Sequence, residues 1–220
     1  MQHDPIGDLI TSRRIARHWP AHLLAFVLDD GSVAARAVSI PFNADRTGRE
    51  ALPDTGWDGA VQWALEDLLD EVAPTSACAL EIAVADHHRG KGLSAAAIAA
   101  LRDTAKRQGL RELVAPLRPP DKATEPTVPM SVFMNRTRPD GLPTDRWLRA
   151  HVRAGATLVG VAPRSMTVLG SIAEWREWTG LPLEDDGPIH VSGALAPVLI
   201  NHQLDLGLYV EPNVWVRHLT

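Results

Sequence analysis

The sequence has little of what builds secreted, membrane-spanning or nucleic-acid-binding proteins. It contains one cysteine, so no internal disulfide can form, and the apolar run around Cys78 favours a buried small hydrophobic residue over a nucleophile. No stretch approaches the roughly 18 apolar residues of a membrane span, and the first residues lack the apolar segment of a signal peptide. The net charge of -5 excludes a broad basic surface for nucleic acid or anionic lipid. We therefore expect a cytoplasmic protein with neither a nucleic-acid nor a membrane partner.

The sequence also shows no metal-ligand spacing of His, Cys and Asp, no internal repeat and no linker between domains. Apolar residues make up 45% of the chain and charged residues 22%, which is typical of a globular protein. We therefore expect a single domain over residues 1–220, without a metal site.

Hydrophobic periodicity predicts alternating strands and helices. The predicted strands are Leu23–Leu28, Val33–Ile40, Ala77–Ala85, Leu113–Leu117, Thr157–Ala162, Met166–Leu169, Leu195–Ile200 and Val214–Leu219. The predicted helices are Asp8–His18, Asp58–Val72, Ser94–Gln108, Thr144–Arg153 and Ile172–Thr179. Residues 118–145 are rich in proline and predict a long loop that is mobile and covers the site. The strand, loop, helix and strand within residues 77–117 favour an α/β layer architecture.

The most informative segment is the loop His87–Leu93, which connects a buried strand to a helix. Gly90 and Gly92 let the backbone curl and approach a ligand closely, and Arg89 and Lys91 add positive charge. The first turn of the following helix contains no acid, so the positive end of the helix dipole is left open for an anion such as pyrophosphate. The dinucleotide-binding and Walker A patterns both fail, for want of a third glycine and of Gly-Lys-Ser/Thr.

The pattern His87-His88-Arg89-Gly90-Lys91-Gly92 resembles motif A of the GNAT acetyltransferases, Gln/Arg-x-x-Gly-x-Gly/Ala between a central strand and a helix. His87 departs from the pattern, since it stands where the family has Gln or Arg. The resemblance implies a GNAT-like α/β (α+β) fold, with a mixed, mostly antiparallel central sheet flanked by helices. It also implies acetyl-CoA or another acyl-CoA as co-substrate, its pyrophosphate on backbone N–H groups and its pantetheine arm along the strand edge. The expected cofactor-binding residues are Ile82, Val84, His87, His88, Arg89, Gly90, Lys91, Gly92, Leu93 and Ser94.

The resemblance further implies a proton donor for the departing thiolate. Many members of the family carry a tyrosine four residues before a glycine, in the helix after the second motif strand. His151 has that position relative to Gly155, whereas the only tyrosine, Tyr209, lies far downstream. Because histidine titrates near neutrality, His151 is the candidate catalytic acid, and Glu81, which interrupts an apolar strand, is the candidate base. The alternatives are a packing role for His151 and an ion pair with an arginine for Glu81.

We therefore expect an acyl-CoA-dependent N-acyltransferase that moves an acyl group, in the first place acetyl, directly to a small-molecule amine. Trp147, Trp175 and Trp178 are candidates for the wall of an acceptor pocket, and Ser165 for a hydrogen bond to the acceptor. Other acyl-CoA chemistry stays open: O-acylation, transfer of a longer acyl chain or decarboxylation of a malonyl thioester. A non-catalytic CoA-binding module is a further alternative, which the missing tyrosine favours. The acceptor's identity and the choice between monomer and homodimer are open as well.

Overall fold

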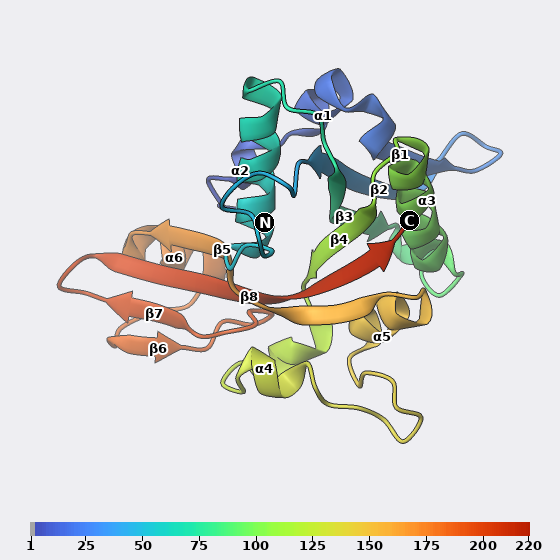
Figure 1. The fold of residues 1–220 in the computed structure, drawn as a ribbon. Coiled ribbons are helices and arrows are strands. Elements are labelled where there is room, and N and C mark those ends of the chain that lie inside the picture. The colour runs from blue at the N-terminus through green and yellow to red at the C-terminus, as the bar shows by residue number, and fades with distance from the viewer. Residues whose placement is uncertain (1–2) are drawn as a thin grey trace.

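The computed structural model describes residues 3–220 as a mixed α/β fold around one sheet (Figure 1). The strands are β1 Leu23–Val27, β2 Val33–Phe42, β3 Ser76–Val84, β4 Glu112–Leu117, β5 Thr157–Gly170, β6 Gly187–Ile189, β7 Val198–Asn201 and β8 Leu206–Leu219. Within the described residues the strand order is β1-β2-β3-β4-β8-β7-β6, and β5 pairs with the other edge of β8. β3 and β4 are parallel and the other pairs are antiparallel, so the predicted mixed, mostly antiparallel sheet is confirmed.

Helices cover both faces of this sheet. They are α1 Ser12–His18, α2 Gly56–Leu69, α3 Leu93–Arg107, α4 Met130–Phe133, α5 Arg146–Arg153 and α6 Ile172–Thr179, with short 3-10 turns η1 Gly7–Leu9, η2 Pro20–His22, η3 Asp86–His88 and η4 Pro120–Thr124. Figure 1 shows α2 and α6 on one side of the long β5–β8 pair and α4 and α5 on the other. Among residues 3–220, no helix combines the length and the apolar character needed to cross a bilayer.

α3 packs closely on the strands because its inward side chains are small. Ala97 and Ala105 are fully buried and lie one above the other with Leu101 on the face that contacts β2, β3 and β4. Gly109, with a φ of +73°, follows the C-terminal end of the helix, as the sequence predicts. This packing fixes the N-terminal end of α3 beside the end of β3.

Residues 118–145 differ most from the prediction of a long mobile loop. They contain η4 and α4, and Met130 and Phe133 belong to the same hydrophobic cluster as α3. Lys122 is buried, and its ammonium group donates hydrogen bonds to the carbonyl oxygens of Glu125 (2.6 Å) and Leu195 (2.8 Å). These buried side chains hold the segment against the rest of the protein, which its proline-rich composition did not predict.

The strand predictions were incomplete in the last third of the chain. The two strands predicted at 157–162 and 166–169 form a single strand, β5, whose pairing with β8 is interrupted between Ala162 and Met166. The sequence also did not predict β6 or the first half of β8, residues 206–213, where Gly207 and Pro212 obscure the alternation.

Candidate active site

The loop after β3 leaves the N-terminal end of α3 open. Gly92 occupies the N-cap position at a φ of +80°, no side chain caps the helix, and the first turn contains no acid. Gly90 has a φ of +77°, and a Cβ atom on either glycine would meet no protein atom within 4 Å. The backbone conformation therefore requires glycine, while the space in front of the loop stays clear. Unpaired N–H groups at such a helix end attract an anion.

The charged side chains of the loop lie at the surface. Arg89 pairs with Asp86 at 2.8 Å, and both side chains are mostly exposed. Lys91 Nζ lies 3.3 Å from His88 Nδ1, and the rings of His87 and His88 are 4.1 Å apart. An exposed ion pair of this kind is weak, so Arg89 is free to turn toward an incoming phosphate.

Beside this loop the two parallel strands of the sheet separate. The register pairs Ala77 with Leu113 and Cys78 with Val114 and then ends. β3 continues to Val84 while paired with β2 on its other side, so its edge toward β4 has no strand partner from residue 79 onward. Free N–H and C=O groups along a strand edge are a template for an extended, amide-bearing ligand.

A cavity of about 250 Å³ fills the gap between the separated strands. Residues from six helices and strands line it, among them Trp57, Glu81, Ile82, Trp147, His151 and Asn213. The structure thus brings together both predicted catalytic residues and one predicted pantetheine contact, Ile82. Val84 lies at the end of β3, between this cavity and the Gly-rich loop.

His151 is buried in the wall of this cavity, with 2% of its surface exposed. Its Nδ1 atom lies 3.0 Å from Nε2 of His218, and the edge of its ring faces Trp147 at a centroid distance of 4.7 Å. Its Nε2 atom has no hydrogen-bond partner among the described residues. Burial, and secondarily His218, lower the pKa of His151 to about 3, so the ring is uncharged at neutral pH.

Glu81 also faces the cavity, but it is held by an arginine. Arg36 on β2 binds both carboxylate oxygens, with Nη2 2.9 Å from Oε2 and a second contact from Nε to Oε1. The register skips Leu80, because Val38 pairs with Glu81 and Ser39 with Ala79. This bulge bends β3 at the mouth of the cavity, as bulges commonly do near functional sites.

Two further polar residues of the site come from the part of β8 that the sequence analysis missed. Glu211 is 2% exposed and accepts hydrogen bonds from Arg118 Nε (2.9 Å) and from the hydroxyl of Tyr209 (2.7 Å). Asn213 donates to Glu211 at 3.3 Å, and its side-chain oxygen has no partner within residues 3–220. The sequence signal that could have revealed them is the alternate spacing of Tyr209, Glu211 and Asn213, which places all three on one face of a strand.

Two other candidates from the sequence have structural contacts. Ser165 is fully buried, and its hydroxyl accepts a hydrogen bond from the backbone N–H of Trp57 at 2.9 Å. It therefore anchors the start of α2 rather than facing an acceptor. Cys78 is fully buried, and burial raises the pKa of its thiol, which agrees with its interpretation as a small core residue.

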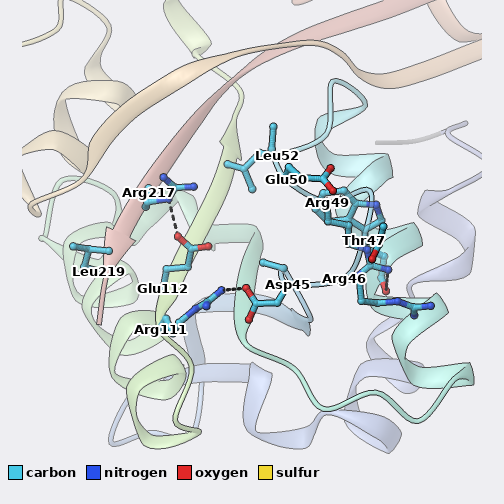
Figure 2. Close-up of a pocket in the computed structure, with 13 residues that line it drawn as sticks. Asp45, Arg46, Thr47, Arg49, Glu50, Leu52, Arg111, Glu112, Arg217 and Leu219 are labelled. Carbon is cyan, nitrogen blue, oxygen red and sulfur yellow. Dashed lines mark hydrogen bonds and ion pairs between the residues drawn. The ribbon is translucent and has the colours of Figure 1, made fainter.

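A larger cavity, of about 660 Å³, lies at the opposite end of the sheet, where β2 ends and β4 begins (Figure 2). Most of its charged side chains are paired within the protein, for example Arg111 with Asp45 at 2.8 Å and Arg217 with Glu112 at 2.7 Å. Because most of its charges are paired and the Gly-rich loop lies at the other end of β3, we assign the chemistry to the smaller cavity.

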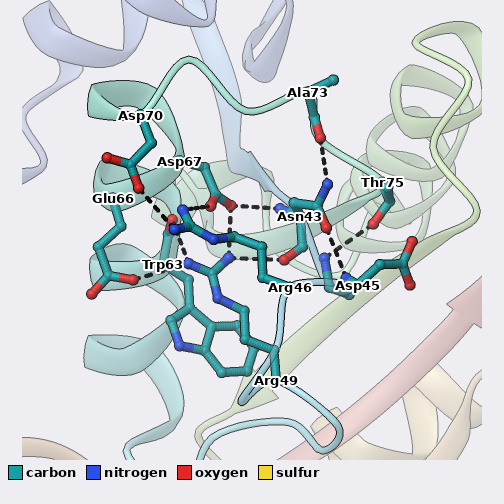
Figure 3. A network of polar contacts seen from close by, with 11 residues as sticks. Asn43, Asp45, Arg46, Arg49, Trp63, Glu66, Asp67, Asp70, Ala73 and Thr75 are labelled. Atoms are coloured by element: carbon teal, nitrogen blue, oxygen red, sulfur yellow. Dashed lines mark hydrogen bonds and ion pairs between the residues drawn. The ribbon is translucent and has the colours of Figure 1, made fainter.

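The loop along this larger cavity is fixed by a buried carboxylate (Figure 3). Asp67 on α2 binds Arg46 at 2.9 Å and Arg49 at 2.7 Å, and it accepts the backbone N–H of Asn43 at 2.6 Å. Arg49 also stacks over the ring of Trp63, 4.8 Å from its centroid. These contacts attach residues 43–52 to α2. Nowhere in residues 3–220 are three or more His, Cys, Asp or Glu side chains arranged to hold a metal ion.

Comparison with known proteins adds one relative by sequence. No protein-family model matches the chain. The arginine N-acetyltransferase avaD of Aspergillus versicolor is 35% identical over 187 residues, which cover 76% of this chain and 64% of that protein. The chain thus spans less than two thirds of the length of this relative.

Two solved structures share the fold at low sequence identity. The loading GNATL domain of CurA from Lyngbya majuscula matches with a TM-score of 0.61 and 14% identity, covering 96% of this chain and 83% of that one. The GphF GNAT-like decarboxylase in complex with isobutyryl-CoA matches with a TM-score of 0.56 and 14% identity, covering 99% and 89%. The fold that motif A implied is therefore confirmed.

Proposed function

We propose that this chain is a member of the GNAT superfamily and transfers an acyl group from acyl-CoA to a nitrogen atom of a small-molecule acceptor; its fold and its similarity to an N-acetyltransferase support this. One observation carries the proposal: an open helix N-terminus leads directly to an unpaired strand edge and a cavity that contains His151 and Glu81. The relative that is an arginine N-acetyltransferase supports acetyl as the acyl group and an arginine-like molecule as the acceptor.

The co-substrate would lie along these features in order. The pyrophosphate would accept hydrogen bonds from the backbone N–H groups of residues 89–94, with Lys91 and the ring of His88 beside it. The pantetheine arm would pair with the free edge of β3 through Ile82 and Val84, and the thioester would enter the 250 Å³ cavity. The chain's own part in this step is to bind and orient the thioester carbonyl.

The reaction needs a neutral acceptor nitrogen, which attacks the thioester carbonyl carbon. A C–N bond forms, the C–S bond breaks, and the thiolate takes up the proton that the acceptor nitrogen loses. Glu81 is placed to accept that proton, directly or through water, when the acceptor competes with Arg36 for its carboxylate. Glu81 therefore remains the candidate base.

His151 would act in its uncharged form, because its pKa of about 3 leaves almost no imidazolium at neutral pH. If His218 Nε2–H donates to His151 Nδ1, then His151 Nε2 carries a proton and has no partner within residues 3–220. That N–H would donate a hydrogen bond to the developing thiolate and stabilise its charge. The proton that finally reaches sulfur would then come from the acceptor nitrogen.

Product analysis tests this proposal. The chain is incubated with acetyl-CoA and L-arginine, free thiol is measured, and the products are identified by mass spectrometry. We expect release of CoA and a product heavier than arginine by one acetyl group, both requiring the two substrates together. A parallel incubation with malonyl-CoA alone tests for decarboxylation, the alternative reaction. Loss of CO₂ there, without acylation of any amine, would replace the proposal by a decarboxylase, and CoA binding without turnover would leave a non-catalytic module.

A further inference from the structure

A second cavity, of about 360 Å³, adjoins the thioester cavity on the face of the sheet that carries α2 and α6. The two cavities share Arg118 and Met166 in their walls. Segments that are distant in sequence line the second cavity, among them Asp4 near the start of the chain, α6, residues 191–194, and Tyr209 and Glu211 of β8. Its size suits a small ligand such as an amino acid.

A pair of buried acids, Asp4 and Asp58, adjoins this cavity. Asp4 is 1% exposed and lines the cavity, and its Oδ2 atom has no hydrogen-bond partner within residues 3–220. Asp58 lies beside Asp4, behind the cavity wall, and is 7% exposed; the two carboxyl groups share a side-chain hydrogen bond, and Asp58 Oδ1 has no partner within residues 3–220. Glu211, by contrast, is paired with Arg118. Two adjacent buried carboxyl groups cannot both ionise without a proton between them or a cation beside them, so Asp4 and Asp58 are suited to a positively charged ligand that replaces the proton.

The protonation of the pair agrees with this interpretation. Burial, followed by repulsion from Asp4, raises the pKa of Asp58 to about 8. Near pH 7 Asp58 is therefore protonated, and its proton takes the place that a bound cation would have. The other titratable groups around the pair are Glu211, Tyr209 and His3.

An aromatic wall stands opposite the acids. A Cβ atom at Gly170 would lie 2.6 Å from the Trp178 ring, and one at Gly207 would lie 2.1 Å from the Trp175 ring, so both glycines allow the rings to pack on the strands. The indole N–H of Trp175 donates to Gly207 O at 2.9 Å. His3 stacks on Trp178 at a centroid distance of 4.1 Å and an interplanar angle of 16°. The face of Trp178 thus already carries one planar group, the His3 ring, and a guanidinium group could stack there in its place.

We propose that this cavity binds the guanidinium group of the acceptor, with the Asp4–Asp58 pair as its counter-charge and with Trp178 as its stacking surface, from which it displaces the His3 ring. The inference rests on the proposed function, since it places the rest of the acceptor toward the shared wall of Arg118 and Met166, where the thioester cavity begins. A nitrogen held as a cation is no nucleophile, so the acylated nitrogen is a different one, the α-amine of an arginine-like molecule.

Calorimetric binding of L-arginine and of L-citrulline, its neutral isostere, tests the proposal on the full chain. We expect wild-type protein to prefer arginine, and Asp4→Asn and Asp58→Asn each to reduce that preference by at least about tenfold, the usual cost of losing a charged hydrogen bond. Asp185→Asn removes the same charge from an exposed residue and serves as the matched control. Arginine should also displace the proton that the acid pair holds. Its binding enthalpy, measured in buffers of different ionisation enthalpy, should therefore vary as expected for the release of about one proton.

Three outcomes would overturn the inference: equal affinity of wild-type protein for arginine and citrulline, an unchanged preference in folded acid variants, or acetylation on the guanidine group. Should the acid variants fail to fold, Trp178→Leu keeps both charges and changes only the wall, and unchanged arginine affinity in that variant would contradict the proposal equally. CoA affinity, measured on the same preparations, separates the two levels. If wild-type protein binds CoA normally but shows no preference for arginine, only the cation site is contradicted. If wild-type protein does not bind CoA, the proposed function itself is contradicted.

Discussion

Acidification should destabilise this protein through three buried histidines. His22, His151 and His218 are at most 4% exposed, and burial lowers their pKa values to about 4, about 3 and about 4, with smaller contributions from His218 to His151 and from Arg102 to His218. In the unfolded chain each should titrate near 6.5. Because the folded pKa values are depressed, each histidine takes up a proton on unfolding below pH 6.5. Their stabilisation is therefore complete above that pH and is lost as the pH falls toward the folded values.

The magnitude follows from the count of protons. Each proton taken up on unfolding corresponds to about 1.4 kcal/mol per pH unit. Asp58 acts in the opposite direction, because burial raises its pKa to about 8 and the folded protein holds a proton that the unfolded chain loses. Three histidines against one carboxyl group leave a net loss of about 2 kcal/mol per pH unit near pH 5.5, and about 3 kcal/mol in all between pH 6.5 and 5. Such a loss is a large part of a typical unfolding free energy of about 5–15 kcal/mol.

Urea unfolding followed by tryptophan fluorescence, at several pH values and constant ionic strength, measures this dependence. His22→Gln changes a histidine whose Nδ1 lies 2.8 Å from Ser39 Oγ, away from the active site, and should reduce the pH slope by about 1.4 kcal/mol per unit. The exposed His190 gives the control, because His190→Gln should leave the slope unchanged. An unfolding free energy that stays constant from pH 6.5 to 5 would refute the reasoning.

Three further predictions concern single residues. Asp67→Asn should lower the unfolding free energy by about 2–3 kcal/mol in urea titrations, because it removes the buried carboxylate of Arg49 and leaves that arginine only the exposed Glu66, whereas the exposed Asp70→Asn should cost at most about 1 kcal/mol. Gly207→Ala should destabilise by about 1–3 kcal/mol through its clash with the Trp175 ring, while Gly160→Ala, where a Cβ meets no atom within 4 Å, should be tolerated; equal melting temperatures would contradict the close packing. His151→Ala should reduce kcat in the thiol-release assay by roughly 10²–10³-fold with CoA affinity nearly intact, and a stable, fully active variant would exclude the role proposed for it.

The conformation of the loop His87–Leu93 could be predicted from the sequence because all of its determinants are contiguous. The two glycines, the acid-free helix start and the buried strand lie within one short segment, and each reports a local property: positive φ, an uncapped helix end or burial on both sides. The likeness of the loop to motif A then predicted the fold. Residue roles at the loop itself stay predictions until a ligand is bound.

The acid pair could not be predicted, because its members meet only through the tertiary fold. Asp4 and Asp58 each read as ordinary solvated acids in sequence, and Glu211 belongs to a half-strand that Gly207 and Pro212 obscured. For His151 the position was predictable from its spacing to Gly155, but its ionisation was not. Its low pKa comes from burial against His218, which the pairing of β4 with β8 brings into place.

Calorimetric titration of CoA into wild-type protein and the Gly92→Glu variant tests the central claim most directly. Glutamate at position 92 would project bulk and negative charge into the clear space in front of the α3 N-terminus, where the pyrophosphate should bind. Gly141→Glu is the matched control, since Gly141 has a similar φ of +76° and equally open surroundings but lies in another loop, so both variants carry the same backbone strain. The account predicts that Gly92→Glu abolishes CoA binding while Gly141→Glu keeps it. Equal CoA affinity in folded Gly92→Glu and wild-type protein would contradict the account.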